Sequence, residues 1–313
     1  MTRVAVVDIG TNSTRLLIAD VDPTGSTVDE LVRRSTVTRL GDGVDASGSL
    51  SSEAIDRTCA TLAGYRKLID ENNCVSNLAV LTSAVRDASN GPDFTKRVRD
   101  DFALDARTLT GDEEAQLTFL GAMHERESST EPTVVIDIGG GSTEFIVGHD
   151  STAGFHVSLH AGVVRMSERH IHSDPPAPAE LQSLAHDVRT VFLAGLPPEQ
   201  RAGGGAPITR GIAVAGTATS AASIDQELDP YDPSRVQGYP LELATVELLL
   251  ARLADMDEAR RRQVVGLHPD RAPTIVAGMI LLGEAMRAFE LDQVEVSEHD
   301  ILFGGALQLA GAR

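Results

Sequence analysis

Two stretches of the chain share one pattern of apolar and polar positions. Val6 to Ile18 (VVDIGTNSTRLLI) aligns without a gap with Val135 to Val147 (VIDIGGGSTEFIV), 129 positions further on, and six of the thirteen positions are identical. Each stretch has an apolar run ending in Asp-Ile-Gly, a small polar turn and a second apolar run, which predicts a hairpin of two buried strands. The separation is too long for a solenoid repeat, so we expect two related halves whose facing loops define a cleft.

The two hairpin turns are rich in glycine, hydroxyl and amide groups. The candidate phosphate-binding residues are Gly10, Thr11, Asn12 and Ser13 in the first turn, and Gly139, Gly140, Gly141, Ser142 and Thr143 in the second. Such turns can direct several backbone N–H groups at one phosphate oxygen. For either copy alone, the alternative is an ordinary glycine-containing hairpin turn.

An aspartate stands at the same place in both hairpins, as Asp8 and Asp137. An acidic side chain at the mouth of an anion-binding loop would repel phosphate unless a cation lies between them. The repeated aspartate therefore predicts a bound metal ion such as Mg²⁺.

Further elements follow the first hairpin. Leu31 to Leu40 reads as another strand, and Ser51 or Ser52 caps a helix that runs to about Glu71. Leu78 to Thr82 is a short apolar strand, and Arg86 stands just past its end, where the sites of α/β folds gather. Arg86 therefore reads either as a phosphate ligand or as a surface arginine paired with Asp87.

A helix is predicted from Thr110 to about Glu125. Thr110 and Glu113 have the spacing of a capping box, which gives Glu113 a structural role. Glu114 has no such role and lies in the first turn, where the helix dipole favours the ionised carboxylate. An ionised, partly exposed glutamate facing a phosphate is a candidate general base for water; a favourable charge on a helix end is the alternative.

The polar, proline-containing segment 125–132 is the predicted domain boundary. It separates a first domain, residues 1–127, from a second domain, residues 128–299. The second domain contains a helix with Arg165 and Arg169 on one face, and a helical tract over most of residues 241–289. We expect the C-terminal helix, residues 300–313, to pack back on the first domain.

Composition restricts the class of protein. The chain has 313 residues, of which 42% are hydrophobic, so it can bury two domain cores. It has no run of eighteen apolar residues and no signal-peptide pattern, so we expect a cytoplasmic protein without a membrane segment. A net charge of −19 argues against binding to nucleic acid or to membranes. Because of this charge, an anionic substrate would need a bound metal ion and a few arginines close to it. Arginine is expected as the side-chain cation because no P-loop pattern with its lysine occurs.

Six motifs together resemble the exopolyphosphatase and guanosine pentaphosphate phosphatase (Ppx/GppA) family, over essentially the whole chain. They are DIGTNSTRLL, LTSAVRDASN, LTGDEEAQLTFLGA, VIDIGGGSTEF, VAGTATSAA and VEVSEHDILFGG. The resemblance implies a duplicated ribonuclease-H-like fold of the actin, hexokinase and Hsp70 superfamily, with two α/β domains around a cleft. This agrees with the internal duplication.

The resemblance also assigns roles to individual residues. It implies that Glu114 is the catalytic base, that Asp137 and Glu144 bind Mg²⁺, and that Asp8 completes the acidic set. The two turns and Arg86 would form the phosphate cradle. Glu144 has Arg15 as its counterpart in the first hairpin, so the two copies have diverged at this position.

The activity implied is hydrolysis of the terminal phosphoryl group of inorganic polyphosphate. The chain ends near the point where the first two domains of longer members end, so we expect short polyphosphate to be favoured. Hydrolysis of guanosine pentaphosphate is the close alternative. Two other classes stay open: a small-molecule kinase or ATPase, which would need an open adenosine pocket near residues 216–220, and a sensor that binds guanosine tetraphosphate or polyphosphate without turnover. The helical C-terminal half offers surfaces for a homodimer.

Overall fold

The computed structural model describes residues 1–126, 131–150, 152–201 and 208–311. The chain divides into two compact α/β units. Unit 1 consists of Met1–Glu127 and His299–Arg313, and unit 2 of Ser128–Glu298. Within the polar segment 125–132, residues 127–130 lie outside the described part of the chain.

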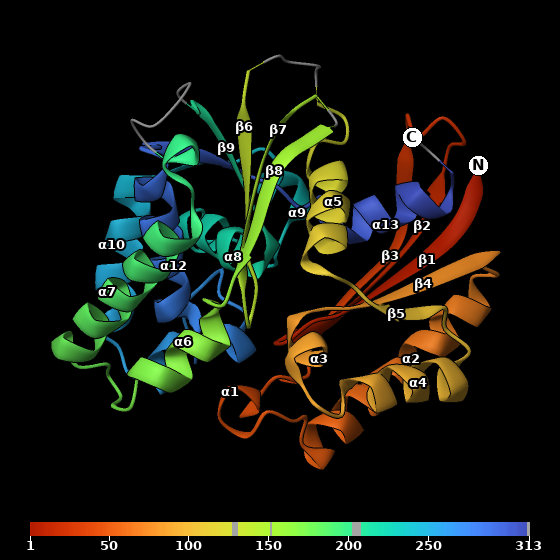
Figure 1. Ribbon diagram of the computed structural model, residues 1–313, viewed down its shortest axis with the longest axis horizontal. Coiled ribbons are helices and arrows are strands. Elements are labelled where there is room, and N and C mark those ends of the chain that lie inside the picture. The colour runs from red at the N-terminus through yellow and green to blue at the C-terminus, as the bar shows by residue number, and fades with distance from the viewer. Residues whose placement is uncertain (127–130, 151, 202–207, 312–313) are drawn as a thin grey trace. The chain divides into compact units, whose positions relative to one another are not determined.

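Unit 1 contains a five-stranded sheet with the strand order β3-β2-β1-β4-β5 (Figure 1). Its strands are β1 (Thr2–Ile9), β2 (Ser13–Val21), β3 (Val28–Val37), β4 (Ser76–Leu81) and β5 (Ala106–Thr108). Its helices are α1 (Val44–Ser47), α2 (Ser52–Glu71), α3 (Ser83–Asp87), α4 (Gly91–Phe102), α5 (Gly111–Ala122) and α13 (Ile301–Leu309). Strands β1, β2 and β3 are antiparallel neighbours, whereas β4 and β5 run parallel to β1.

Strand β1 is apolar from Val4 to Val7, as expected for a strand covered on both faces of its sheet. Ala5, Val7 and Ile9 belong to the core that contains the apolar residues of α2 and α4. Val4 and Val6 point to the other face and pack with Leu302 and other residues of α13. The last helix therefore completes unit 1, and Figure 1 shows α13 beside α5 on this face of the sheet.

Two helices of unit 1 begin as the sequence predicts. Ser51 caps α2, because its hydroxyl accepts a hydrogen bond from the Ala54 N–H at 3.2 Å. Thr110 and Glu113 form the predicted capping box at the start of α5. Such caps satisfy N–H groups that have no partner inside the helix, and they fix where the helix begins.

Unit 2 contains a six-stranded sheet with the strand order β10-β11-β9-β6-β7-β8. Its strands are β6 (Thr133–Ile138), β7 (Thr143–His149), β8 (Thr152–Leu159), β9 (Arg210–Val214), β10 (Pro240–Glu242) and β11 (Gln293–Val296). Its helices are α6 (Val163–His170), α7 (Pro178–Gly195), α8 (Ala215–Asp225), α9 (Pro233–Val236), α10 (Leu243–Ala254), α11 (Glu258–Arg261) and α12 (Ile275–Ala288), with 3-10 turns at Pro198–Gln200 and Pro269–Arg271.

The core of unit 2 lies between this sheet and its long helices. Phe145 of β7 packs edge-on against Phe192 of α7, with ring centroids 4.9 Å apart, and against Phe289, just after α12, at 5.2 Å. Helix α12 is buried along almost all of its length. Aromatic pairs of this geometry add to the stabilisation from buried area.

The two sheets repeat one topology. Strands β1, β2, β3 and β4 of unit 1 correspond in order, direction and pairing to β6, β7, β8 and β9 of unit 2. The predicted duplication and α/β fold class are therefore confirmed.

Two predicted elements differ from those observed. The strand expected at 31–40 covers Val28–Val37. The helical tract expected over 241–289 begins inside strand β10 and is divided into α10, α11 and α12, with breaks at 255–257 and 262–274. Pro269 lies in the second break, where Gly266 has a φ of +83°. Proline lacks the helical N–H donor and a left-handed backbone conformation is not helical, so neither residue lets a helix continue through the second break.

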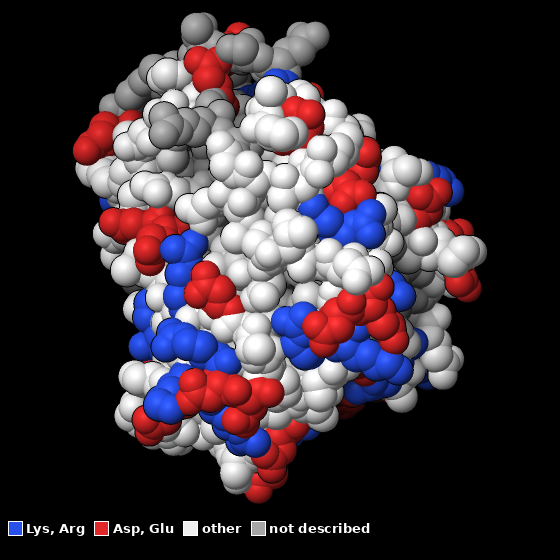
Figure 2. Space-filling model, turned by 90° about the vertical axis from the view of Figure 1, so that its right-hand side faces the viewer, with Lys and Arg blue, Asp and Glu red and all other residues white. Residues whose placement is uncertain are grey.

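The charged surface is mixed. Figure 2 shows Lys and Arg side chains interspersed with Asp and Glu on one face of the molecule. Part of this mixing is local, since Lys96 pairs with Asp100 and Arg97 with Asp101 one turn along α4. None of the helices described here has the length and apolar character needed to cross a bilayer.

Candidate active site

The turn of hairpin 1, formed by β1 and β2, is closed and clamped by backbone hydrogen bonds. The Gly10 N–H donates to the Ser13 carbonyl at 3.0 Å. The Thr11 carbonyl accepts from the Gly41 N–H at 2.8 Å, and the Asn12 carbonyl accepts from the N–H groups of residues 38 and 39 at 3.1 and 2.9 Å. The clamp is the segment that follows β3.

The turn of hairpin 2, formed by β6 and β7, has the same closure and a clamp in the same place. The Gly139 N–H donates to the Ser142 carbonyl at 3.0 Å. The carbonyls of Gly139 and Gly140 accept from the N–H groups of residues 163 and 164, at 3.0 and 2.8 Å. The Gly141 carbonyl accepts from Arg165 Nε at 2.9 Å. This clamp follows β8 and is the first turn of α6.

These clamps decide where the turn N–H groups point. In a trans peptide the C=O of one residue and the N–H of the next point in opposite directions. Because the turn carbonyls face the clamps, the next N–H groups point away from them: those of Asn12 and Ser13 in hairpin 1, and those of residues 140–142 in hairpin 2. Both turns therefore present backbone N–H groups on the side away from their clamps, and phosphate binding by these groups stays a prediction.

Two predicted phosphate ligands use their hydroxyl groups inside their own unit. Thr143 Oγ1 donates to the Ala161 carbonyl at 2.5 Å and is fully buried. Thr11 Oγ1 and Ser83 Oγ are 2.9 Å apart, which ties hairpin 1 to the start of α3. These hydroxyls hold the turns in shape, and their role as phosphate ligands stays a prediction.

Arg86 and Glu114 form an ion pair in unit 1. Arg86 lies in α3, just after β4, and its Nη1 donates to Glu114 Oε2 at 2.8 Å and to the Leu109 carbonyl at 3.1 Å. The sequence offered a phosphate or Asp87 as partners of Arg86. The observed partner is the candidate catalytic base, in the first turn of α5.

Glu114 is more buried than the sequence suggests. It is 7% exposed, whereas we expected a partly exposed carboxylate stabilised by the helix dipole. Burial raises the pKa of Glu114, since a charged carboxylate loses solvation. Arg86 opposes this rise, and the negative charges of Asp8 and Asp87 add to it. A carboxylate with a raised pKa is a stronger base towards water than an exposed one.

Asp8 lies next to an arginine on the same face of hairpin 1. It is directly opposite Arg15 in the β1–β2 ladder. Arg15 donates to Asp8 Oδ2 from Nε at 2.9 Å and from Nη2 at 2.6 Å, and its Nη1 binds Asp300 at the start of α13. Burial raises the pKa of Asp8 even with Arg15 beside it. The prediction that Asp8 binds a metal ion stays a prediction.

Hairpin 2 places two carboxylates where hairpin 1 places a carboxylate and a guanidinium. Asp137 and Glu144 are directly opposite in the β6–β7 ladder, with exposures of only 9% and 2%. Ser158 of β8, the next residue across the sheet, donates to Glu144 Oε1 at 2.7 Å. Opposed like charges destabilise a sheet unless a cation or a proton lies between them.

The pair in hairpin 2 suits Mg²⁺, which proteins commonly hold through one or two carboxylates, with waters and phosphate oxygens as the remaining ligands. Within the residues that the structure describes, no group of three or more His, Cys, Asp or Glu side chains is arranged to hold a metal ion. The predicted set of three spans both units, so the geometry inside either unit does not test it.

Sequence reasoning missed several side chains that shape the site. Asp300 lies in the motif VEVSEHDILFGG. An aspartate directly before an apolar helix is a signal for an N-cap, so this role of Asp300 could have been predicted. Arg165 was noticed as part of a helix face, but its contact with Gly141 was not foreseen. No sequence pattern marks Ser158, because its contact with Glu144 depends only on the register between β7 and β8.

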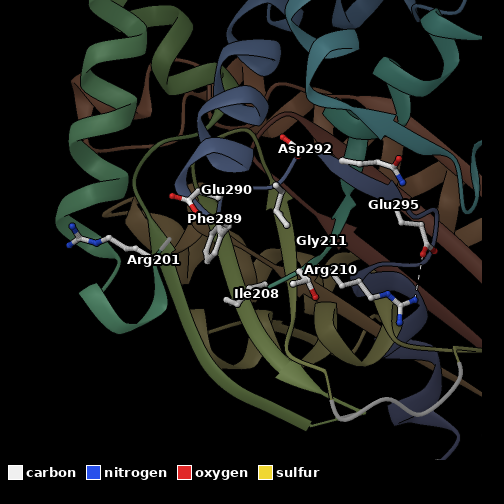
Figure 3. A pocket seen from close by; sticks show the side chains of 11 residues that line it. Arg201, Ile208, Arg210, Gly211, Phe289, Glu290, Asp292 and Glu295 are labelled. Carbon is white, nitrogen blue, oxygen red and sulfur yellow. Dashed lines mark ion pairs between the residues drawn. The ribbon is translucent and has the colours of Figure 1, made fainter. Parts of the chain in front are cut away.

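A cavity of about 620 Å³ also occurs in unit 2 (Figure 3). Its lining includes Arg210, Phe289 and Glu295, and Arg210 pairs with Glu295 at 3.5 Å. Arg210 begins β9 and is opposite Thr133, whereas the turn of hairpin 2 follows the other end of β6. The cavity is therefore at the opposite end of the sheet from the candidate site.

Comparison with known proteins identifies the family of the chain. The chain matches the model of the Ppx/GppA phosphatase family over residues 17–304. It is 37% identical to exopolyphosphatase 2 of Mycobacterium tuberculosis, over 99% of each chain. It is similar to a crystal structure of an exopolyphosphatase from Cytophaga hutchinsonii, with a TM-score of 0.87 and 27% identity over 100% of this chain and 99% of that chain.

A second solved structure, the Ppx/GppA family member of Aquifex aeolicus, has a TM-score of 0.81 and 27% identity over 98% of this chain and 97% of that chain. These matches extend through both units, and they bear out the resemblance that the six motifs indicated. The chain belongs to the Ppx/GppA phosphatase family.

Proposed function

We propose that this enzyme is an exopolyphosphatase that uses Mg²⁺ to remove the terminal phosphoryl group of inorganic polyphosphate. The family assignment and the names of its relatives support this reaction. The observation that carries the proposal is the buried Glu114, paired with Arg86 in the unit that also contains the turn of hairpin 1. A buried glutamate and an arginine are the groups needed to activate water and to bind phosphate.

The proposed reaction is a single displacement. The oxygen of a water molecule attacks the terminal phosphorus, and the bond from that phosphorus to the bridging oxygen breaks. Glu114 accepts the proton that the attacking water loses. The products are orthophosphate and a polyphosphate shortened by one unit, which leaves as the anion.

In this proposal Arg86 contacts Glu114 before substrate binds, and it contacts a phosphoryl oxygen as well once substrate is bound. Its guanidinium has several donors, and Nη1 is the one that contacts Glu114. A phosphoryl oxygen can therefore bind the remaining donors. The turn N–H groups of hairpin 1, which lies in the same unit as Arg86, supply further donors to phosphate oxygens.

Phosphatases of this family are generally metal-dependent. We assign the ion as Mg²⁺ and its protein ligands as Asp137 and Glu144. Bound there, the ion would reduce the negative charge that a polyphosphate brings to a protein with a net charge of −19. Mg²⁺ matches a site with two carboxylates, because it keeps several other positions for water and phosphate.

Hydrolysis of guanosine pentaphosphate is a second candidate that the family permits. A kinase or ATPase is less favoured by the geometry of unit 2. The sequence required an open adenosine pocket near residues 216–220, but the Arg271 guanidinium packs on Gly216, where an added Cβ would lie 1.6 Å from Nη1. A sensor without turnover would have no use for the buried base.

Phosphate release measured side by side on four substrates tests the proposal: short polyphosphate, polyphosphate of hundreds of units, guanosine pentaphosphate and ATP, each with and without Mg²⁺. We expect release from polyphosphate, dependence on Mg²⁺ and little release from ATP. Release from guanosine pentaphosphate alone would replace the proposed substrate. No release from any of the four, with retained binding, would support the sensor.

The length preference can be read from the products of partial digestion. Units beyond the site would meet a surface of mixed sign on a strongly acidic protein, so we expect them to add little affinity. Short polyphosphate should then be cleaved at least as efficiently per chain end as long polyphosphate. A ladder of shortened chains is the expected product pattern. Full-length polymer beside fully degraded product would show processive cleavage and contradict this preference.

A further inference from the structure

The two hairpins place residues of opposite charge at one equivalent position. In hairpin 1, the row across the sheet reads Asp8, Arg15 and Ser35; in hairpin 2, it reads Asp137, Glu144 and Ser158. The aspartate and the serine are therefore retained in both rows, and only the central residue differs. The difference at the centre is a change of two charge units.

Arg15 lies between two buried carboxylates. Asp8 is 5% exposed and Asp300 is 2% exposed, and the guanidinium donates to both. Two donors of Arg15 converge on one oxygen of Asp8, and a third binds Asp300. Arg15 is thus a fixed positive charge, shared by two anions in the way a bound cation would be.

Asp300 is held in place by contacts that do not involve hairpin 1. Its Oδ1 accepts from the Leu302 N–H at 3.0 Å, so Asp300 is also the N-cap of α13. Arg15, Arg33 and this N–H together outweigh burial and lower the pKa of Asp300. The carboxylate is therefore ionised at neutral pH, and it keeps Arg15 at the position opposite Asp8.

We infer that Arg15 takes, in hairpin 1, the place that the metal ion takes in hairpin 2, so that the protein binds one divalent cation per chain and Asp8 is not one of its ligands. The inference rests on the proposed function in one respect, the assignment of the cation to Asp137 and Glu144. It makes Arg15 and Asp300 positioning residues, which hold the Asp8 side chain, and it leaves the acidic pair of hairpin 2 as the metal ligands.

Calorimetric titration of the metal-free protein with Mn²⁺ tests this inference without measuring activity. We expect about one Mn²⁺ per chain for the wild type. Asp8→Asn should keep the dissociation constant within about twofold, because asparagine can still accept a hydrogen bond from Arg15. A tenfold or greater loss of Mn²⁺ affinity in Asp8→Asn, or two Mn²⁺ per wild-type chain, would overturn the inference.

The matched variant in hairpin 2 separates this inference from the proposed function. Asp137→Asn should weaken Mn²⁺ binding at least tenfold. If Asp137→Asn binds Mn²⁺ as the wild type does, the proposed metal site fails, while the statement about Asp8 is still decided by Asp8→Asn. The two failures therefore give different results.

A charge-removing variant gives a second, independent measurement. Arg15→Met leaves Asp8 and Asp300 without their shared cation, so we expect added Mn²⁺ to raise its melting temperature by more than it raises that of the wild type. Arg15→Lys keeps the charge and should respond to Mn²⁺ as the wild type does. An equal response of Arg15→Met and the wild type would count against the inference.

Discussion

Hairpin 1 and hairpin 2 share their backbone but not their side-chain chemistry. Each turn is closed by one hydrogen bond of 3.0 Å and is clamped through its carbonyls by the segment after the third strand of its unit. The side chains differ at the centre of the row, where Arg15 stands in one and Glu144 in the other. In our proposal, the duplication kept an anion-binding backbone twice, while unit 1 took over proton transfer and unit 2 took over the metal ion.

The strongest test of this division is the base in unit 1. We expect Glu114→Gln to lower phosphate release by about 10² to 10⁴-fold, the usual contribution of a general base. Polyphosphate binding, measured by calorimetry, should stay within a few-fold, since Glu114 acts on water. Glu113→Gln is the matched control and should keep most activity, because glutamine also completes a capping box. Turnover of Glu114→Gln within threefold of the wild type would remove Glu114 from the mechanism.

The corresponding test in unit 2 concerns the cation. Asp137→Asn and Glu144→Gln should each raise the Mg²⁺ concentration needed for half-maximal activity by about tenfold or more, since each removes one anionic ligand. Ser158→Ala is a control on the same row and should raise it less, because Ser158 only orients Glu144. Full activity in a chelator, or an unchanged Mg²⁺ requirement in both variants, would contradict the division of roles.

The two clamps can be compared through their glycines. A Cβ added at Gly162 would lie 2.5 Å from backbone atoms of Gly140, whereas one added at Gly41 would lie 2.2 Å from the Thr11 methyl group. The Thr11 side chain can turn about its Cα–Cβ bond at the cost of its contact with Ser83, whereas a clamped backbone cannot turn away. We expect Gly162→Ala to cost about 1–3 kcal/mol of stability and Gly41→Ala clearly less, measured as calorimetric melting temperatures. Equal losses would mean that the clamps are equally rigid.

The smallest effect concerns pH. The pKa of Glu114 is raised, and the base acts only when deprotonated, so activity should fall on the acid side at a pH above 4.5, the ordinary pKa of a glutamate. Arg86 lowers the pKa of Glu114, against the effects of Asp8 and Asp87. Arg86→Gln should therefore move the acid limb of the kcat profile to higher pH. Arg97→Gln, on the surface of α4, is the control and should leave the limb in place.

The sequence predicted those parts of the molecule that depend on local pattern. The repeated apolar runs predicted both hairpins, and the spacing of Thr110 and Glu113 predicted the start of α5. The motifs gave the family and the fold class. The predictions of hairpins and of the helix start succeed because strand patterns and helix caps depend on residues close together in the chain.

The side-chain partners could not be predicted in the same way. Arg86 meets a glutamate 28 residues away, and Arg15 meets an aspartate 285 residues away. Such pairs depend on which elements the fold brings together. The burial of Glu114 has the same origin, since a first-turn position on a helix does not reveal what covers it. The homodimer and the binding of guanosine tetraphosphate stay predictions.

The return of α13 to unit 1 has a consequence for how the protein is made. Residues 1–126 can form their strands as they leave the ribosome, but Arg15 meets Asp300 only after 285 further residues have been added. At about 5–20 residues per second, this takes roughly 15 to 60 s. During that time Val4 and Val6 lack the helix that covers them. Unit 2, which is continuous in the chain, is synthesised in the interval, so the unit that contains the proposed catalytic base is the last to be completed.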